Sequence, residues 1–149
     1  MERVEHTDLS SAEITDILGM PISANVAFLD RNGYPRMLPC WYVWLNNTFI
    51  TTSIRGKFHV ACLKDDPRGS FCVDFEYTKN SVRINRQVKG FGTFEILDSD
   101  IDIQNRIRKK YLDDDTPSLS GTERVVLSLK PEKLSAHGVD LIPNQNKPR

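Results

Sequence analysis

The segment FITTSIRGKFHVACLKDDPRGSFCVDFE, from Phe49 to Glu76, contains the changes of pattern that decide the fold. An apolar run rich in β-branched residues leads into the loop TTSIRGK, and a short amphipathic helical pattern follows. Asp66 and Pro67 end that helix, because the residue before a proline disfavours the helical conformation. A second apolar run begins just after them. The segment therefore predicts a strand, a loop, a helix over residues 57–64 and a further strand over residues 69–77.

Apolar runs separated by turn residues flank this segment on both sides. The stretch from Asp30 to Gly33 and the pair Asn46-Asn47 are strong turn signals. Most connections are too short for parallel crossovers, so neighbouring strands are expected to be antiparallel. We predict a mainly β fold, a closed or split six-stranded barrel with peripheral helices. The expected strands cover residues 22–29, 34–45, 48–53, 69–77, 82–97 and 124–129, with residues 133–137 extending the sheet.

Two further helices are expected around the barrel. Ser10 and Glu13 have the spacing of a capping box at the start of a helix that runs to about residue 18. Ser99 with Asp102 begins the other helix, and a loop over residues 113–122 follows it. The length fits one domain over residues 1–149, with residues 1–9 as a polar arm and residues 143–149 as a flexible tail.

Three residues within the predicted strands depart from the usual pattern. Pro39 cannot donate a hydrogen bond to a ladder, so it indicates an edge or a bulge in the second strand. Gly90 and Gly92 fall on the inward parity of the fifth strand. They indicate a strongly coiled barrel strand, or the close approach of something flat to the backbone.

The composition narrows the class of protein. Lys plus Arg and Asp plus Glu both number 20, a balance that argues against nucleic-acid and membrane-surface proteins. Three cysteines in separate elements and three scattered histidines give no disulfide framework and no metal site. The N-terminus is too polar for a signal peptide, and no apolar run approaches membrane length. These features predict a cytoplasmic protein with buried, reduced thiols.

The loop TTSIRGK has the composition of an anion site. Thr51, Thr52 and Ser53 supply hydroxyl donors, Arg55 supplies a planar fork and Lys57 a point charge. The helix that begins at the lysine adds free backbone N–H groups. Together they would neutralise a phosphate dianion, and Arg36 on the preceding strand could complete the cradle. The alternative is a polar turn with two solvated cations.

The order of these motifs resembles the pyridoxamine 5'-phosphate oxidase-like family, the FMN-binding split β-barrels. The resemblance extends over roughly residues 14–135 and lies in an ordered set of individually weak motifs, among them GYPRMLPCW, the basic loop, D-P-R and VKGFGTFEIL. The corresponding residues are Gly33, Pro35, Pro39, Trp41, Thr51, Arg55, Lys57, Leu63, Asp66, Pro67, Arg68, Gly92, Phe94 and Glu95.

The resemblance implies a homodimer of six-stranded split barrels with two FMN sites at the subunit interface. It implies flavin-mediated two-electron (hydride) transfer to or from a small substrate that the sequence does not name, with NAD(P)H as a possible electron source. By this likeness Arg36, Thr52, Ser53, Arg55 and Lys57 hold the FMN phosphate. The strand Met37-Leu38-Pro39 runs beside the isoalloxazine ring, and Gln87 is a further flavin contact.

The sequence also departs from the family pattern. True pyridoxamine-phosphate oxidases carry a C-terminal Trp and Arg segment, whereas this chain has no Trp after Trp44. The departure argues against pyridoxamine-phosphate oxidation. Three alternatives remain: a deazaflavin-dependent reductase of the same fold, a non-enzymatic flavin- or haem-binding protein, and a structural dimer whose basic loop is only a turn. Trp41 is interpreted as an interface residue more readily than as a flavin contact, and both can hold in a dimer.

Overall fold

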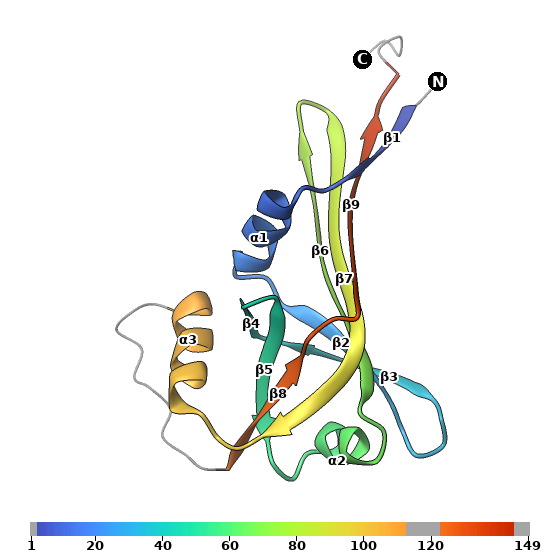
Figure 1. The fold of residues 1–149 in the computed structure, drawn as a ribbon. Coiled ribbons are helices and arrows are strands. Elements are labelled where there is room, and N and C mark those ends of the chain that lie inside the picture. The colour runs from blue at the N-terminus through green and yellow to red at the C-terminus, as the bar shows by residue number, and fades with distance from the viewer. Residues whose placement is uncertain (1–2, 113–122, 145–149) are drawn as a thin grey trace.

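The computed structural model describes residues 3–112 and 123–144 of the chain (Figure 1). Within these ranges the chain forms three helices and nine strands. The helices are α1 (Ser11–Gly19), α2 (Phe58–Asp65) and α3 (Ile101–Tyr111). The strands are β1 (Arg3–Asp8), β2 (Ala24–Leu29), β3 (Pro35–Cys40), β4 (Tyr42–Leu45), β5 (Thr48–Ile54), β6 (Arg68–Lys79), β7 (Val82–Leu97), β8 (Arg124–Leu129) and β9 (Lys133–Ile142). The predicted loop over residues 113–122, and residues 145–149 of the predicted tail, lie outside the described residues.

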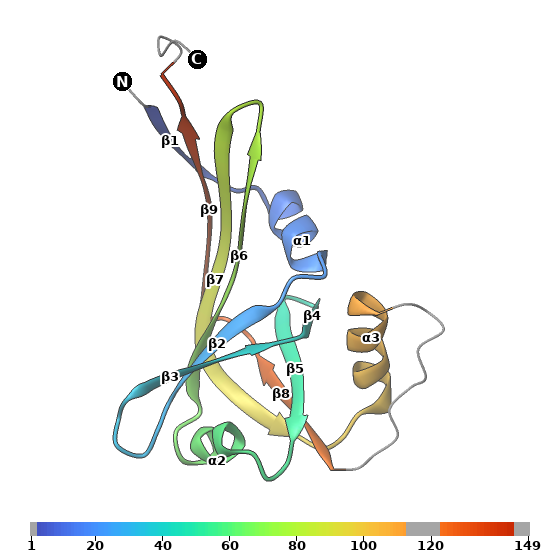
Figure 2. The same ribbon diagram turned by 180° about the vertical axis from the view of Figure 1, so that it is seen from behind.

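The strands β2 to β8 close into a barrel, in which the consecutive strands β3 and β4 act as one run (Figures 1 and 2). Hydrogen-bonded neighbours follow the order β3-β2-β6-β7-β8-β5-β4, and every pair is antiparallel. β3 pairs with β2 and β4 pairs with β5, so the run from Pro35 to Leu45 closes the ring by passing between the two sheets. The predicted class is confirmed. The strand count is higher than six because the second predicted strand breaks at Trp41 and because β9 and β1 lie beyond the ring.

The break at Trp41 has a local cause in the backbone hydrogen bonds. Pro39 lies opposite Asn25 in the ladder between β3 and β2, where it can only accept. The backbone of Trp41 belongs to neither ladder, and its carbonyl accepts a bond of 2.6 Å from Thr51 Oγ1. A side chain thus satisfies the peptide group at which the strand changes sheets.

A long β blade extends from the barrel. The first half of β7 pairs with β9, from Arg83 opposite Leu141 to Phe91 opposite Lys133, and its last residues pair with β8. β1 pairs along the outer edge of β9. Residues 3–8, predicted as part of a polar arm, are therefore a strand. All six of their side chains are exposed, so the segment has no apolar alternation that could have revealed it.

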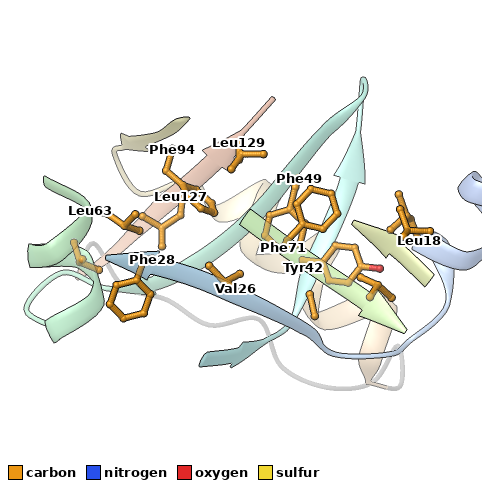
Figure 3. Close-up of a cluster of buried hydrophobic side chains, with 14 of the residues drawn as sticks. Leu18, Val26, Phe28, Tyr42, Phe49, Leu63, Phe71, Phe94, Leu127 and Leu129 are labelled. Carbon is orange, nitrogen blue, oxygen red and sulfur yellow. The ribbon is translucent and has the colours of Figure 1, made fainter. Parts of the chain in front are cut away.

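Stacked aromatic rings form the centre of the core (Figure 3). The Phe49 ring lies 4.5 Å from that of Phe71 and 4.9 Å from that of Tyr42, nearly parallel to both. A Cβ at Gly90 would lie 2.7 Å from the Phe71 ring. Gly90 therefore permits the close approach of a flat group, and that group is the Phe71 ring of the protein itself.

The helix ends follow the capping chemistry. Ser10 and Glu13 form the predicted capping box of α1, with side-chain to backbone distances of 3.2 and 3.1 Å. The N-cap of α3 is Asp100 rather than Ser99, because its carboxylate accepts from the backbone N–H groups of Asp102 and Ile103. None of the three helices in the described part of the chain is long and apolar enough to span a bilayer.

Candidate functional site

A cavity opens where the strands of the barrel separate. β4 pairs with β5 only from Tyr42 opposite Thr51 to Leu45 opposite Thr48. Beyond Thr51 the preceding strand turns away to pair with β2, which leaves the end of β5 without a partner on that side. A space of about 300 Å³ lies in this gap. Its lining consists of Val26, Leu38, Pro39, Cys40, Trp41, Thr51, Thr52, Ser53, His59, Leu63, Gln104, Ile107, Arg108, Arg124 and Leu127.

The three hydroxyls of β5 have different partners. Thr51 is buried and donates to the Trp41 carbonyl, as described above. Thr52 Oγ1 accepts a bond of 3.2 Å from Arg124 Nη1 on β8. Ser53 Oγ lies 2.6 Å from His59 Nε2, so a hydroxyl from β5 and an imidazole from α2 form a pair in the cavity wall. One hydroxyl thus supports the strand break, while the other two organise side chains that face the cavity.

His59 is a neutral imidazole at neutral pH. Burial lowers the pKa of His59 below its ordinary value, and the nearby charge of Lys57 lowers it further. A neutral ring has one donor and one acceptor nitrogen, so it can either accept from Ser53 or donate to it. The two residues can therefore share a proton. The Ser53 hydroxyl can act toward His59 either as the hydrogen-bond donor or as the acceptor.

Helix α3 forms the wall opposite β3 and contributes two polar side chains with unpaired buried atoms. Gln104 is 3% exposed, and its Nε2 donates to Ser99 Oγ at 3.1 Å. Its Oε1 has no hydrogen-bond partner among the described residues, and neither has Nε of Arg108. Buried polar atoms are rarely left unpaired in native proteins, so these two atoms mark a place where a ligand group is expected.

The C-terminal end of α3 is fixed to the barrel. Tyr111 Oη donates to the Ile22 carbonyl at 2.8 Å, and its ring stacks on Trp41 at 4.8 Å with a 3° angle. Lys110 Nζ donates to the carbonyls of Leu18 and Tyr42 at 2.7 and 3.1 Å. These contacts hold the cavity wall in place, and among the side chains that line the cavity they use only the ring of Trp41.

Comparisons with solved structures identify proteins with a similar fold. No protein-family model and no curated protein matches the sequence. A FAD-binding protein from Mesorhizobium loti is 22% identical with a TM-score of 0.64, over 92% of this chain and 97% of that one. A pyridoxamine 5'-phosphate oxidase-related, FMN binding protein from Nostoc punctiforme is 14% identical with a TM-score of 0.60, over 86% and 84%. An F420 reductase is 17% identical with a TM-score of 0.63, over 80% and 94%. The chain has the fold of the FMN-binding split barrels.

Half of the residues predicted for the site line the cavity of this split barrel. They are Leu38, Pro39, Thr51, Thr52 and Ser53. The other five, Arg36, Met37, Arg55, Lys57 and Gln87, do not line it.

Two of these five are engaged elsewhere on the surface of the split barrel. Arg36 is exposed, lies 3.4 Å from Asp30 Oδ2 and covers the Phe58 ring at 5.0 Å. Gln87 lies on the blade and donates to Asn85 Oδ1 at 2.8 Å. The other three, Met37, Arg55 and Lys57, are exposed.

Sequence reasoning missed several polar residues that line the split-barrel cavity. Gln104, Arg108 and Arg124 come from α3 and β8, far from the basic loop in sequence. Gln104 and Arg108 are four residues apart, which puts them on one helix face beside Ile107. That spacing is visible in the sequence, but the docking of this face onto the barrel is not.

Cys40 also lines the cavity of the split barrel. Burial raises the pKa of its thiol to about 11, so the group remains protonated at neutral pH. The thiol is therefore a poor nucleophile.

Proposed function

We propose that this chain is an FMN-binding, oxidoreductase-like protein in which a bound flavin exchanges two electrons with a small substrate. The observation that carries the proposal is the cavity between β3 and β5, whose apolar walls end in hydroxyl and cationic groups. Ligand sites of this type are concave, mostly apolar, and equipped with a few orienting polar groups. The fold of the FMN-binding split barrels, and the FAD-binding and FMN-binding proteins that share it, support a flavin as the ligand.

The residues present fit the two ends of a flavin mononucleotide. A flat ring needs an apolar slot, which Leu38 and Pro39 of β3 help to form. A phosphate needs cations, and Arg55 and Lys57 are exposed without an acidic partner among the described residues. Arg55 is two residues from Ser53 and Lys57 is two residues from His59, and both Ser53 and His59 line the cavity. The backbone of each cation therefore lies within about 7 Å of the backbone of a lining residue. We assign the phosphate to this rim.

A second subunit completes the site in this proposal. Arg36, Met37 and Gln87, which the sequence predicted as cofactor contacts, lie outside the cavity of this subunit. Large apolar side chains are exposed on and beside β3, with Met37 at 67% and Trp41 at 42%. Exposed apolar groups of this size are typical of interfaces. We therefore propose a homodimer in which Gln87 contributes to the cofactor site of the other subunit.

The chain contributes binding and orientation to this chemistry. When bound, the flavin supplies the hydride chemistry, as cofactors of this kind do. The apolar walls exclude water from the ring, and the Ser53–His59 pair can donate or accept a proton at the cavity wall. NAD(P)H is the proposed electron source. The similarity to an F420 reductase favours one second candidate, a deazaflavin bound at the same rim and slot.

The absorption spectrum of the purified protein, with mass measurement of any released ligand, tests the proposal. We expect a flavin spectrum, FMN as the released ligand, and bleaching on addition of NAD(P)H. Uptake of a deazaflavin but not of FMN would support the second candidate. Flavin that binds but is never reduced or reoxidised would indicate storage rather than catalysis. A protein that takes up neither cofactor at micromolar concentration would contradict the proposal.

Exchange of the rim cations tests the phosphate assignment. Arg55→Ala and Lys57→Ala should each weaken FMN binding by roughly tenfold, the effect of one lost charge-assisted hydrogen bond. The matched control is Lys79→Ala with Arg106→Ala, two exposed cations outside the cavity lining. Unchanged FMN affinity in the Arg55/Lys57 double variant would refute the assignment. Riboflavin, which lacks the phosphate, should bind the double variant and the wild type equally.

A further inference from the structure

Two guanidinium groups share the cavity, and no carboxylate among the described residues lines it to balance them. They belong to Arg108 of α3 and Arg124 of β8. Neither forms an ion pair among the described residues. Within residues 3–112 and 123–144, Arg124 Nη1 donates to Thr52 Oγ1 and Nε of Arg108 has no partner. The pair is separate from Arg55 and Lys57, which lie outside the lining.

The positive charges of Arg108 and Arg124 are not balanced by a negative charge among the described residues that line the cavity. Two like charges in a partly enclosed space repel each other more strongly than they would in water, because the surrounding dielectric constant is lower. A bound anion removes that repulsion and gains charge-assisted hydrogen bonds from both groups. A guanidinium is a planar fork that matches the two oxygens of a carboxylate, so the pair is suited to a carboxylate head group.

Gln104 adds a second requirement on the ligand. It lies one helical turn before Arg108 in the same wall, and its buried Oε1 lacks a donor. An unpaired buried carbonyl oxygen carries a desolvation penalty that a ligand N–H or O–H would remove. The lining also contains the apolar side chains of Ile107, Leu127 and Trp41. The cavity thus combines a cationic end with apolar walls.

We propose that the α3–β8 side of the cavity is a subsite for a small organic acid, with its carboxylate on Arg108 and Arg124 and its apolar body against Ile107 and Trp41. The inference deepens the proposed function. It rests on that function in one respect, which is that it takes this acid to be the substrate that reacts with the flavin. The anion site itself does not depend on a flavin. Rim cations bind the cofactor's phosphate, and the inner pair binds the substrate.

Calorimetric titration with benzoate tests the subsite, on the flavin-free protein and on the protein loaded with FMN. Benzoate has a carboxylate and a flat apolar body, whereas benzyl alcohol lacks the charge and acetate lacks the body. We expect benzoate to bind at least tenfold more tightly than either. Arg108→Gln and Arg124→Gln should each weaken benzoate by roughly tenfold or more. Arg106→Gln, an exposed cation on the same helix, should change nothing.

The outcomes separate this inference from the proposed function. If Arg108→Gln or Arg124→Gln weakens FMN as strongly as the Arg55 and Lys57 variants do, the inner arginines hold the cofactor's phosphate and the subsite is overturned. If the wild type binds FMN but not benzoate, or binds inorganic phosphate as tightly as benzoate, the subsite is also overturned. Benzoate binding without FMN binding would uphold the subsite and contradict the flavin. Arg108→Lys and Arg124→Lys, which keep the charge, should retain part of the benzoate affinity if the Gln variants fail to fold.

Discussion

The contact between Gly90 and Phe71 gives a sharp test of how the core is built. A Cβ at position 90 would lie 2.7 Å from Cε1 and 2.9 Å from Cζ of Phe71, with Leu134 Cδ1 at 3.3 Å. Carbon atoms in contact normally lie about 3.5–4.0 Å apart, so the ring would have to shift by roughly 1 Å. The Phe49 ring blocks that movement, because it stacks on Phe71 at 4.5 Å.

We therefore expect Gly90→Ala to destabilise the protein. Overpacking of a core costs about 1–3 kcal/mol, and replacing a strand glycine by alanine returns about 0.5–1 kcal/mol of backbone entropy. The net loss should be about 1–2 kcal/mol in the free energy of unfolding, measured by urea denaturation with circular dichroism. Gly19→Ala is the control, since a Cβ at position 19 meets nothing within 4 Å.

A double-mutant cycle shows whether the ring is the cause. In the Phe71→Leu background the same Gly90→Ala change should cost nothing or should stabilise, because the ring that it would strike is gone. The coupling energy between the two positions should therefore exceed about 1 kcal/mol, well above the value for independent sites. A Gly90→Ala variant as stable as the wild type, or a coupling energy near zero, would refute this account of the core.

Two predictions concern titratable groups. Lys110→Met should lower the free energy of unfolding by roughly 1.5–3 kcal/mol, because it removes the charged donor that serves the carbonyls of Leu18 and Tyr42. Burial lowers the pKa of Lys110 from 10.5 to about 8. The unfolded chain therefore binds the proton more tightly than the folded chain does. As the pH rises from 8 to 10.5, the wild type should gain stability relative to the Met variant. A constant difference in the free energy of unfolding between the two proteins across that range would contradict this prediction. The pKa of His59 is also lowered, so the wild type should lose stability as pH falls through about 6.5, the ordinary His value, whereas His59→Gln should not. Parallel urea-denaturation curves at pH 5, 6 and 7 check this, and an equal loss in the Gln variant would show that other groups titrate there.

Much of the fold could be predicted because its signals are local. The pair Asn46-Asn47 has φ angles of 49° and 57°, a left-handed turn that joins β4 to β5 as the sequence indicates. The strand over residues 82–97 matches β7, since one parity of that run is apolar or glycine at every position except Arg86. β1 could not be predicted, because its side chains are all exposed and its stability comes from backbone pairing with β9, whose paired residues lie 129 to 139 positions away in the sequence.

The candidate site was partly predictable for the same reason. Thr52 and Ser53 belong to one continuous motif whose composition alone indicates an anion-binding loop. Arg108 and Arg124 have no such motif, and the sequence favours an interpretation of Arg108 as a cation that complements the C-terminal end of its helix. Only the packing of α3 beside the open end of β5 brings the two arginines into one cavity. Residues that act together across the barrel leave no local pattern.

The two pairs of cations differ in environment, and that difference argues for different ligand groups. Arg55 and Lys57 are exposed, so salt and water screen their charges and the strength of their contact with an anion depends on the ionic strength. Such a pair suits a phosphate that stays partly solvated and attracts it over a distance. Arg108 and Arg124 face a cavity with apolar walls, where screening is smaller and an unmatched charge is more costly. A neutral ligand would leave that cost unrelieved, so in the proposed arrangement the inner pair would select for charge, whereas the rim pair would mainly raise the local concentration of anions.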